Sequence, residues 1–289
     1  NYNLGIYAQD RWTLDRLTLS GGLRVDFLNE STEPFTAKPH RWLPNRNQSY
    51  AAVKNVPNWK DFEPRASAAY DLFGTGKTAL KASFSRGVEQ DSIRYAAANN
   101  PASTLVTQTN RAWDDRTAVP GGIPNDFVPQ CDLTIGTANG ECGPWLTTNF
   151  GSANVATAYD PAVMTGWGNR PYNWEFSTSV QQEIAPRISA SVGYFQRVYG
   201  NFNVVDNENL AKTDFTQYSV TVPTDARLPN SGQTVTGLYD PNILVAQKNV
   251  IKDAANFGKQ QQHWNGVDFS VDARLRGGLF MQAGLSTGK

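Results

Sequence analysis

Apolar and polar residues alternate with a period of two along much of this chain. The clearest example is YNWEFSTSVQQEIAPRISASVGYFQRVYG, residues 172–200. Its apolar positions are Trp174, Phe176, Val180 and Ile184 in the first arm, and Ile188, Ala190, Val192, Tyr194 and Val198 in the second. Successive side chains of a strand point to opposite faces, so this period indicates β-strands rather than helices. The two arms, separated by a short break at Ala185-Pro186, predict one long hairpin.

Three further stretches repeat this design, so we predict four hairpins, or about eight strands in all. The predicted hairpins lie at about 2–28, 61–87, 172–199 and 264–288. Their tight turns fall at Asp15-Arg16, Gly74–Lys77, Ala185-Pro186 and Gly277-Gly278. The arms exceed the roughly five or six residues usual for strands of globular proteins. They match the roughly nine to eleven residues of a transmembrane barrel strand, which is apolar toward lipid and polar toward the lumen.

Long polar segments separate the hairpins, at about 29–60, 88–171 and 200–263. Loops of this length are uncommon in a compact soluble domain. In a meander, alternating tight turns and long loops place all turns at one rim and all loops at the other. This is the asymmetry of outer-membrane barrels, which have short periplasmic turns and long extracellular loops. We therefore predict that 1–289 is part of a single all-β domain, an antiparallel transmembrane β-barrel.

The polar faces of the arms carry full charges. These charged residues are Arg11, Arg24, Asp26, Glu63, Arg65, Asp71, Lys81, Glu175, Glu183, Arg187, Arg197, Asp268, Asp272 and Arg274. Charges are costly in a dry interior, so this face is expected to contact water or a polar plug. A soluble sheet with this face toward solvent explains the charges equally well. It explains less well why four hairpins share one asymmetry.

The amino-acid composition further narrows the class of protein. The chain has 26 basic and 26 acidic residues and no net charge, so nucleic acid is not predicted as a partner. Aromatic residues make up 11% of the chain and Gly is frequent, as is typical of all-β proteins.

The sequence contains no run of the ~18 apolar residues needed for a transmembrane helix. The opening NYNLGIYAQD has no initiator Met and no signal peptide, so we expect a piece of a longer precursor.

Both cysteines, Cys131 and Cys142, lie in one polar, Gly-rich stretch, CDLTIGTANGEC. A disulfide closing a loop of this size contributes about 2–4 kcal/mol. Two closely spaced loop cysteines also fit an oxidising compartment. We predict a disulfide, with two free thiols as the alternative.

No catalytic constellation is visible, so we predict no enzyme, no cofactor and no metal site. Residues 74–78, GTGKT, resemble part of a phosphate-binding loop, but Asp71 occupies the place of its first Gly, and a hairpin turn is predicted instead. The two histidines, His40 and His263, lie too far apart to form a helical metal pair.

Three loop tryptophans, Trp113, Trp145 and Trp167, are the candidate ligand contacts. An indole ring can stack on a sugar or an aromatic ligand. Packing inside a long folded loop is the commoner role of such residues.

The hairpins share short motifs. YAQDRWTLDRLTLSGGLRVDF, residues 7–27, contains aromatic-x-Gln-Asp-x-Trp followed by Leu-Thr-Leu and Gly-Leu-Arg-x-Asp. This segment resembles a barrel hairpin of TonB-dependent outer-membrane receptors. EPRASAAYDLFGTGKTALKASFSRG, NWEFSTSVQQEIAPRISASVGYFQR and WNGVDFSVDARLRGGLFMQAGLSTGK resemble its other hairpins. The resemblance is particularly to the Oar-like branch, which carries a carboxypeptidase-regulatory-like domain.

The resemblance implies a barrel of roughly 22 strands with a plugged lumen, of which this chain is an internal fragment. The family's plug domain, TonB box and terminal aromatic residue are not present in the chain. It further implies energy-coupled uptake of an unknown nutrient ligand, with the TonB complex as a partner through the plug region and outer-membrane lipid around the barrel. The alternatives are a soluble or surface-attached carbohydrate-binding β protein and an outer-membrane adhesion or structural barrel.

Overall fold

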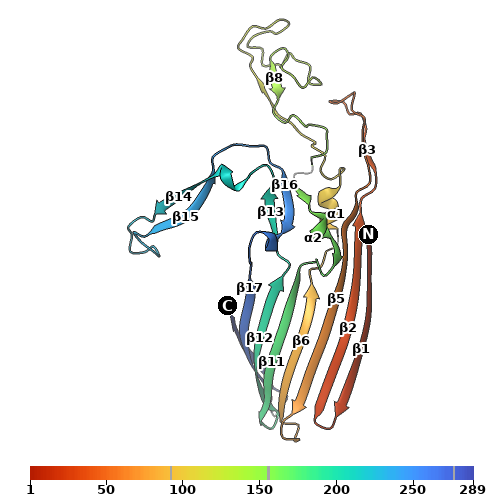
Figure 1. The fold of residues 1–289 in the computed structure, drawn as a ribbon, viewed down its shortest axis with the longest axis vertical. Helices are drawn as coiled ribbons and strands as arrows, with labels where there is room; N and C mark the ends of the chain where they lie inside the picture. Colours follow the sequence, from red (N-terminus) through yellow and green to blue (C-terminus); the bar gives the residue numbers. More distant parts are fainter. Residues whose placement is uncertain (92, 155–156, 276) are drawn as a thin grey trace.

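The computed structural model describes residues 1–91, 93–154, 157–275 and 277–289. Within them, eight long strands form one antiparallel wall in which each strand pairs with the next along the chain (Figure 1). The strands are β1 (Tyr2–Leu14), β2 (Leu17–Ser31), β5 (Lys54–Asp71), β6 (Thr78–Val88), β11 (Tyr172–Ala185), β12 (Ile188–Gly200), β17 (Gln262–Arg274) and β18 (Phe280–Gly288). The sheet is open, with β1 and β18 at its edges. The all-β, antiparallel prediction is confirmed.

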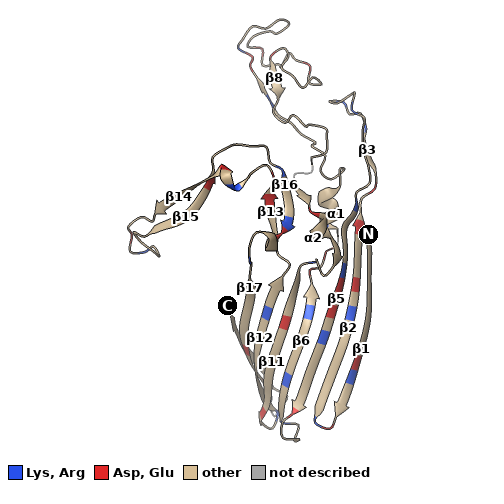
Figure 2. Cartoon of the chain, viewed as in Figure 1, with Lys and Arg blue, Asp and Glu red and all other residues tan. Residues whose placement is uncertain are grey.

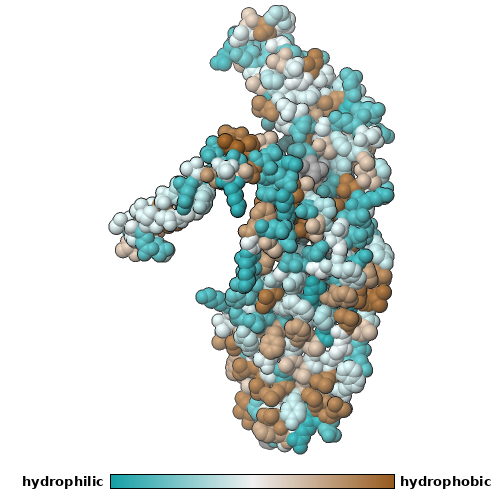
Figure 3. Space-filling view, in the orientation of Figure 1, coloured by the Kyte–Doolittle hydropathy of each residue, from teal (hydrophilic) through white to brown (hydrophobic). Residues whose placement is uncertain are grey.

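The two faces of the wall differ as the alternating pattern predicts. Val180 lies opposite Val192 on one face, and both side chains are exposed. Arg24 lies opposite Glu63 on the other face, and Figure 2 shows charged residues spread along the strands. Hydrophobic residues gather over the lower part of the strands, whereas the loops above are mostly hydrophilic (Figure 3). A one-residue slip would move the whole apolar set to the other face, so the pattern fixes the register.

No helix in the described part of the chain is long and apolar enough to cross a membrane.

Tight turns join the long strands at one end of the wall (Figure 1). Asp15 and Arg187 adopt the left-handed backbone conformation in two of these turns, with φ of 47° and 70°. In the turn after β5, the carboxylate of Asp71 accepts hydrogen bonds from the backbone N–H groups of Gly74 (3.0 Å) and Gly76 (2.7 Å). These amides are therefore satisfied within the hairpin, and GTGKT is a turn, as predicted.

The three long segments contain more structure than the sequence pattern predicted. The first holds β3 (Phe35–Ala37) and β4 (Gln48–Tyr50). The second holds α1 (Arg94–Asn99), β7 (Arg111–Trp113), β8 (Cys142–Trp145), β9 (Thr157–Tyr159), α2 (Pro161–Met164) and β10 (Thr165–Trp167). The third holds β13 (Asn203–Asn207), η1 (Lys212–Asp214), β14 (Phe215–Thr221), β15 (Thr234–Pro241), β16 (Asn249–Asp253) and η2 (Ala254–Asn256). The segment predicted as 88–171 and the hairpin predicted as 264–288 include residues 92, 155–156 and 276, which lie outside the described residues.

The predicted loop 29–60 is wrong from Lys54 onward, because β5 begins there. The reason is a buried contact made by Trp59, which is only 1% exposed. Its Nε1–H donates to the backbone carbonyl of Val163 at 2.8 Å, and its ring meets Tyr95 edge-on at 5.1 Å. Leu28 and Met164 complete this core. The partners lie far along the chain, so the alternation near Trp59 does not reveal them.

This core fastens a small assembly, the rim cap, to the upper ends of β2 and β5. The rim cap comprises α1, α2, β9, β10, β13 and β16. Within it, β13, β16 and β9 form a three-stranded sheet, and α2 contacts both β5 and β16. The loops of the second and third long segments are therefore joined to each other and to the wall.

One strand of the rim cap also extends the wall. β10 pairs in parallel with the upper part of β5, where Trp167 lies opposite Lys60. β6 pairs with β5 only as far as Ser85. Where the two strands separate, Arg86 Nη1 donates to the backbone carbonyl of Phe62 at 2.7 Å. The side chain of Arg86 thus supplies a hydrogen bond to β5 beyond the end of the β5–β6 ladder.

Candidate ligand-binding site

Two of the three candidate tryptophans lie in the β7–β8 hairpin, far out on the second long segment (Figure 1). Trp113 is 41% exposed and donates through Nε1 to a carboxylate oxygen of Glu141 at 3.2 Å. Trp145 is half-buried and its ring meets Phe150 edge-on at 5.1 Å. Both rings therefore take part in packing or hydrogen bonding within the loop. Their contact with a ligand stays a prediction.

Trp167 lies elsewhere, on the apolar face of the wall. Its ring stacks on Phe62 at 4.6 Å and meets Phe27 edge-on at 5.9 Å. The ammonium of Lys60 lies 5.9 Å from the same ring. Aromatic side chains on the apolar face near the strand ends are typical of the girdle at a membrane–water interface. The structure does not bring Trp167 together with Trp113 and Trp145, and its ligand contact also stays a prediction.

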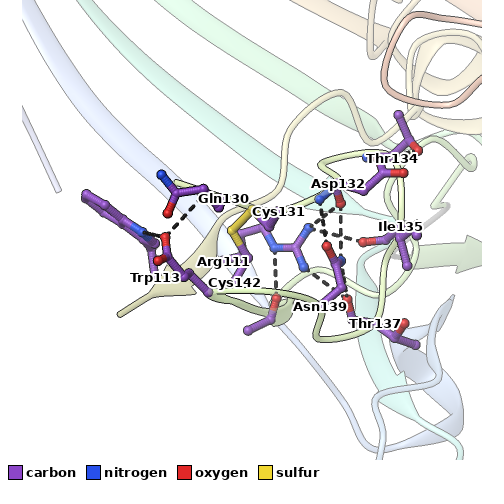
Figure 4. The surroundings of a disulfide bond; sticks show 12 residues. Arg111, Trp113, Gln130, Cys131, Asp132, Thr134, Ile135, Thr137, Asn139 and Cys142 are labelled. Carbon is purple, nitrogen blue, oxygen red and sulfur yellow. Dashed lines mark hydrogen bonds between the residues drawn. A yellow bond between two sulfur atoms is a disulfide. The ribbon is translucent and has the colours of Figure 1, made fainter. Parts of the chain in front are cut away.

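Cys131 and Cys142 are joined in a disulfide, with their Cα atoms 5.9 Å apart. Arg111 lies inside the loop that this bond closes (Figure 4). Its guanidinium donates to the backbone carbonyls of Gly143 (2.8 Å), Thr137 (3.0 Å), Ile135 (3.1 Å) and Asp132 (3.3 Å). A charged donor that satisfies four carbonyls fixes the loop around itself. Arg111 and the disulfide together therefore form a structural framework for residues 111–145, which we call the tip of the second long segment.

An open pocket with a volume of about 420 Å³ lies at the loop end, where the rim cap meets the upper ends of β6, β11 and β12. Five of its lining residues are aromatic: Tyr95, Tyr159, Tyr172, Tyr199 and Phe202. They come from α1, β9, β11, β12 and the segment after β12. Ligand sites are typically concave, with mostly apolar and aromatic walls and a few polar groups. We call this feature the rim pocket.

Two charged residues, Glu89 and Arg94, belong to the rim pocket, all of whose lining residues are described. They neutralise each other, because Arg94 Nη2 lies 2.8 Å from Glu89 Oε1. The guanidinium also lies 4.5 Å from the ring centroid of Tyr95 and 2.7 Å from its hydroxyl. Burial, with the nearby Glu89 carboxylate, raises the pKa of Tyr95 to about 12, and burial also raises the pKa of Tyr159. Both phenols are therefore neutral at physiological pH.

Tyr172 is held in place from two sides. It lies opposite Gly200 across the β11–β12 pair, where a Cβ atom on Gly200 would overlap the phenol ring. The guanidinium of Arg86 lies 4.5 Å from the ring centroid on another side. Asn201, the residue after Gly200, has a backbone φ of 57°, and its side-chain amide donates to the backbone carbonyl of Arg170 at 2.9 Å. The chain leaving β12 is thereby tied to the chain entering β11.

The polar face of β2 and β5 carries buried acidic groups below the rim cap. Asp61 is 1% exposed and lies opposite Asp26. Arg24 pairs with Asp26 at 2.8 Å, and Arg86 lies 3.6 Å from Asp61. Among the described residues, no group of three or more His, Cys, Asp or Glu side chains is arranged to hold a metal ion. This part of the wall therefore holds buried carboxylates that Arg24 and Arg86 offset only in part, since both carboxylate oxygens of Asp61 have no hydrogen-bond partner.

A family comparison agrees with this architecture. The family described as outer membrane beta barrel domain matches residues 1–286. The chain belongs to this family: it is a stretch of antiparallel transmembrane β-barrel that lies in the outer membrane. The alternative of a soluble β protein is therefore wrong. None of the curated proteins compared with the chain matches it.

Similar solved structures include forms of the FrpB iron transporter from Neisseria meningitidis. The apoprotein of its F5-1 variant is 12% identical, with a TM-score of 0.39, and the match covers 99% of this chain and 25% of that one. For the F3-3 variant the identity is 12%, the TM-score 0.37, and the coverage 99% and 25%. The chain thus spans about a quarter of the length of these structures. A likeness of this degree does not extend to ligand or activity.

The sequence pattern did not reveal the rim pocket. Tyr172 and Tyr199 stand at the open end of a predicted hairpin, opposite Gly200 and Asn173, and the presence of aromatic residues at both strand ends was the available signal. Tyr95 lies in a six-residue helix, which is too short to show a helical period. Tyr159 and Phe202 come from the two long segments and reach the pocket only through the rim cap.

Proposed function

We propose that the chain is part of the barrel of a TonB-dependent outer-membrane receptor of the Oar-like branch. In this proposal the full protein takes up a nutrient ligand through a plugged barrel, and the TonB complex delivers energy through the plug region. The resemblance of the four hairpins to that family supports the proposal, as does membership of the outer membrane beta barrel domain family.

The observation that carries the proposal is the rim pocket. It lies at the loop end of the wall, which is the extracellular end in barrels with short periplasmic turns. A ligand arriving from outside would meet this pocket before it reached the charged face below. A barrel with only an anchoring role has no need of such a pocket.

The test uses the full-length protein that contains this chain, purified in detergent. We expect it to bind the purified periplasmic domain of TonB in a pull-down. A matched sample lacking the region N-terminal to the barrel should lose this binding. Absence of binding by the full-length protein would refute the TonB dependence.

A second candidate, adhesion, is favoured by a different observation. The hairpin of β14 and β15 projects away from the wall as an arm (Figure 1), and every residue of β14 is exposed. If the barrel is an adhesion anchor, deleting 215–241 should abolish cell attachment. Under the uptake proposal the same deletion should leave TonB binding intact.

A further inference from the structure

We propose that the rim pocket binds a neutral oligosaccharide. This deepens the proposed function and rests on it, because the same site would capture the ligand for uptake. The inference depends on three properties of the pocket: its aromatic surfaces, its charge and its hydrogen-bonding groups.

The aromatic surfaces suit sugar rings. One face of a pyranose presents C–H groups, which pack on an aromatic ring, while its hydroxyls remain free to form hydrogen bonds. Tyr199, near the end of β12, and Phe202, two residues after that strand ends, both line the pocket. Tyrosine is well suited to this use because one side chain presents both a ring face and a hydroxyl. A volume of about 420 Å³ falls within the usual range for small-ligand sites.

The charge of the pocket argues against an ionic ligand. Glu89 and Arg94 form an ion pair, so neither is left over to balance a charge on the ligand. The same guanidinium is further engaged by the ring and hydroxyl of Tyr95. An anionic iron complex or a charged peptide would therefore find no unpaired opposite charge among the lining residues, whereas a neutral ligand needs none.

Most of the hydrogen-bonding residues of the pocket are uncharged. Four tyrosines, Asn201 and Asn203 line it together with the Glu89–Arg94 pair, and the side-chain N–H groups of Asn201 already donate to the carbonyls of Gly168 and Arg170. Hydroxyls and amides both donate and accept, and a sugar hydroxyl does the same. A site that forms hydrogen bonds with hydroxyl groups discriminates against ligands that lack them, because these bonds would then be lost. These groups therefore favour a polyhydroxylated ligand over a purely apolar one.

The test is calorimetric titration of the full-length protein in detergent with maltohexaose, cellohexaose, laminarihexaose and xylohexaose. We expect at least one of them to bind. Phe202→Ala and Tyr199→Ala should each weaken that binding about tenfold or more, as expected for the loss of a stacked ring. Tyr239→Ala provides the matched control, because Tyr239 lies on the exposed β15 arm outside the pocket. Gly200→Ala, which would displace the ring of Tyr172, should also weaken binding.

Two outcomes overturn the inference: no binding of any of the four sugars, or binding that Phe202→Ala and Tyr199→Ala leave unchanged. Retention of the heat-resistant barrel form on gel electrophoresis shows that the variants are folded. The result is separable from the proposed function. Sugar binding without TonB binding would refute the uptake proposal and keep this inference, whereas TonB binding without sugar binding would do the reverse.

Discussion

Removing the Trp59 side chain is expected to release the rim cap while leaving the barrel wall folded. Trp59 is 1% exposed, and its contacts with Val163 and Tyr95 join β5 to both helices of the cap. Truncating a buried Trp to Ala typically costs about 3–5 kcal/mol. At about 4 kcal/mol, the population of the open cap would rise roughly a thousandfold.

A second substitution separates the two contributions. Trp59→Phe keeps an aromatic ring but removes the N–H that Val163 accepts at 2.8 Å. Leaving a buried carbonyl without its donor costs about 1–3 kcal/mol. Trp59→Phe should therefore lie between the parent chain and Trp59→Ala. Trp12→Ala is the matched control, because Trp12 is 51% exposed on β1.

Hydrogen exchange of the detergent-purified protein measures the effect. In Trp59→Ala, peptides covering α1 and α2 should exchange much faster, while peptides of β11 and β12 should keep their protection. Unchanged exchange in α1 and α2 would show that Trp59 does not anchor the cap. Lost protection in β11 and β12 would show that the cap and the wall unfold as one cooperative unit, which would refute the prediction.

Three further predictions concern the ends of the loops and the turns. Hydrogen bonds from Lys248 and Lys252 lower the pKa of Glu208 from its usual 4.5 to about 2. This interaction therefore stabilises β13 and β16 fully above about pH 4.5, and the stabilisation is lost as the pH falls toward 2. Hydrogen exchange of the two strands should become faster, relative to the other strands, as the pH falls from 4.5 to 2, and Glu208→Gln should not show this change. Reducing the Cys131–Cys142 bond should cost the tip loop about 3 kcal/mol and expose 131–142 to proteases, whereas unchanged cleavage would show that Arg111 alone holds the loop. Finally, Ala185→Cys should resist an impermeant thiol reagent added to intact cells while Ser219→Cys on the arm reacts; ready labelling of Ala185→Cys would reverse the predicted topology.

The wall could be predicted from the sequence because each of its strands carries its own evidence. In 172–199, alternation defines both arms, and the predicted turn at Ala185-Pro186 lies within one residue of the observed turn, Pro186-Arg187. The start of β5 could not be predicted in this way. Trp59 is buried against Val163, which lies 104 residues further along the chain, and the alternation of residues around Trp59 does not predict that contact.

The site was harder to predict for the same physical reason. The rim pocket joins side chains from two long segments and two strands, and only the folded rim cap brings them together. The tryptophans stood out by residue type, but Trp167 lies on the apolar face with Phe62. Residue type alone does not reveal which face a loop residue will occupy.

The base of the second long segment is held to the rest of the molecule by Trp59 and by the pairing of β9 with β16 and of β10 with β5, whereas the disulfide and Arg111 order residues 111–145 at its far end. The tip takes its internal order from contacts among its own residues. Substitutions within 111–145 that keep Arg111, Cys131 and Cys142 are therefore expected to leave the wall and the base of the segment unaltered.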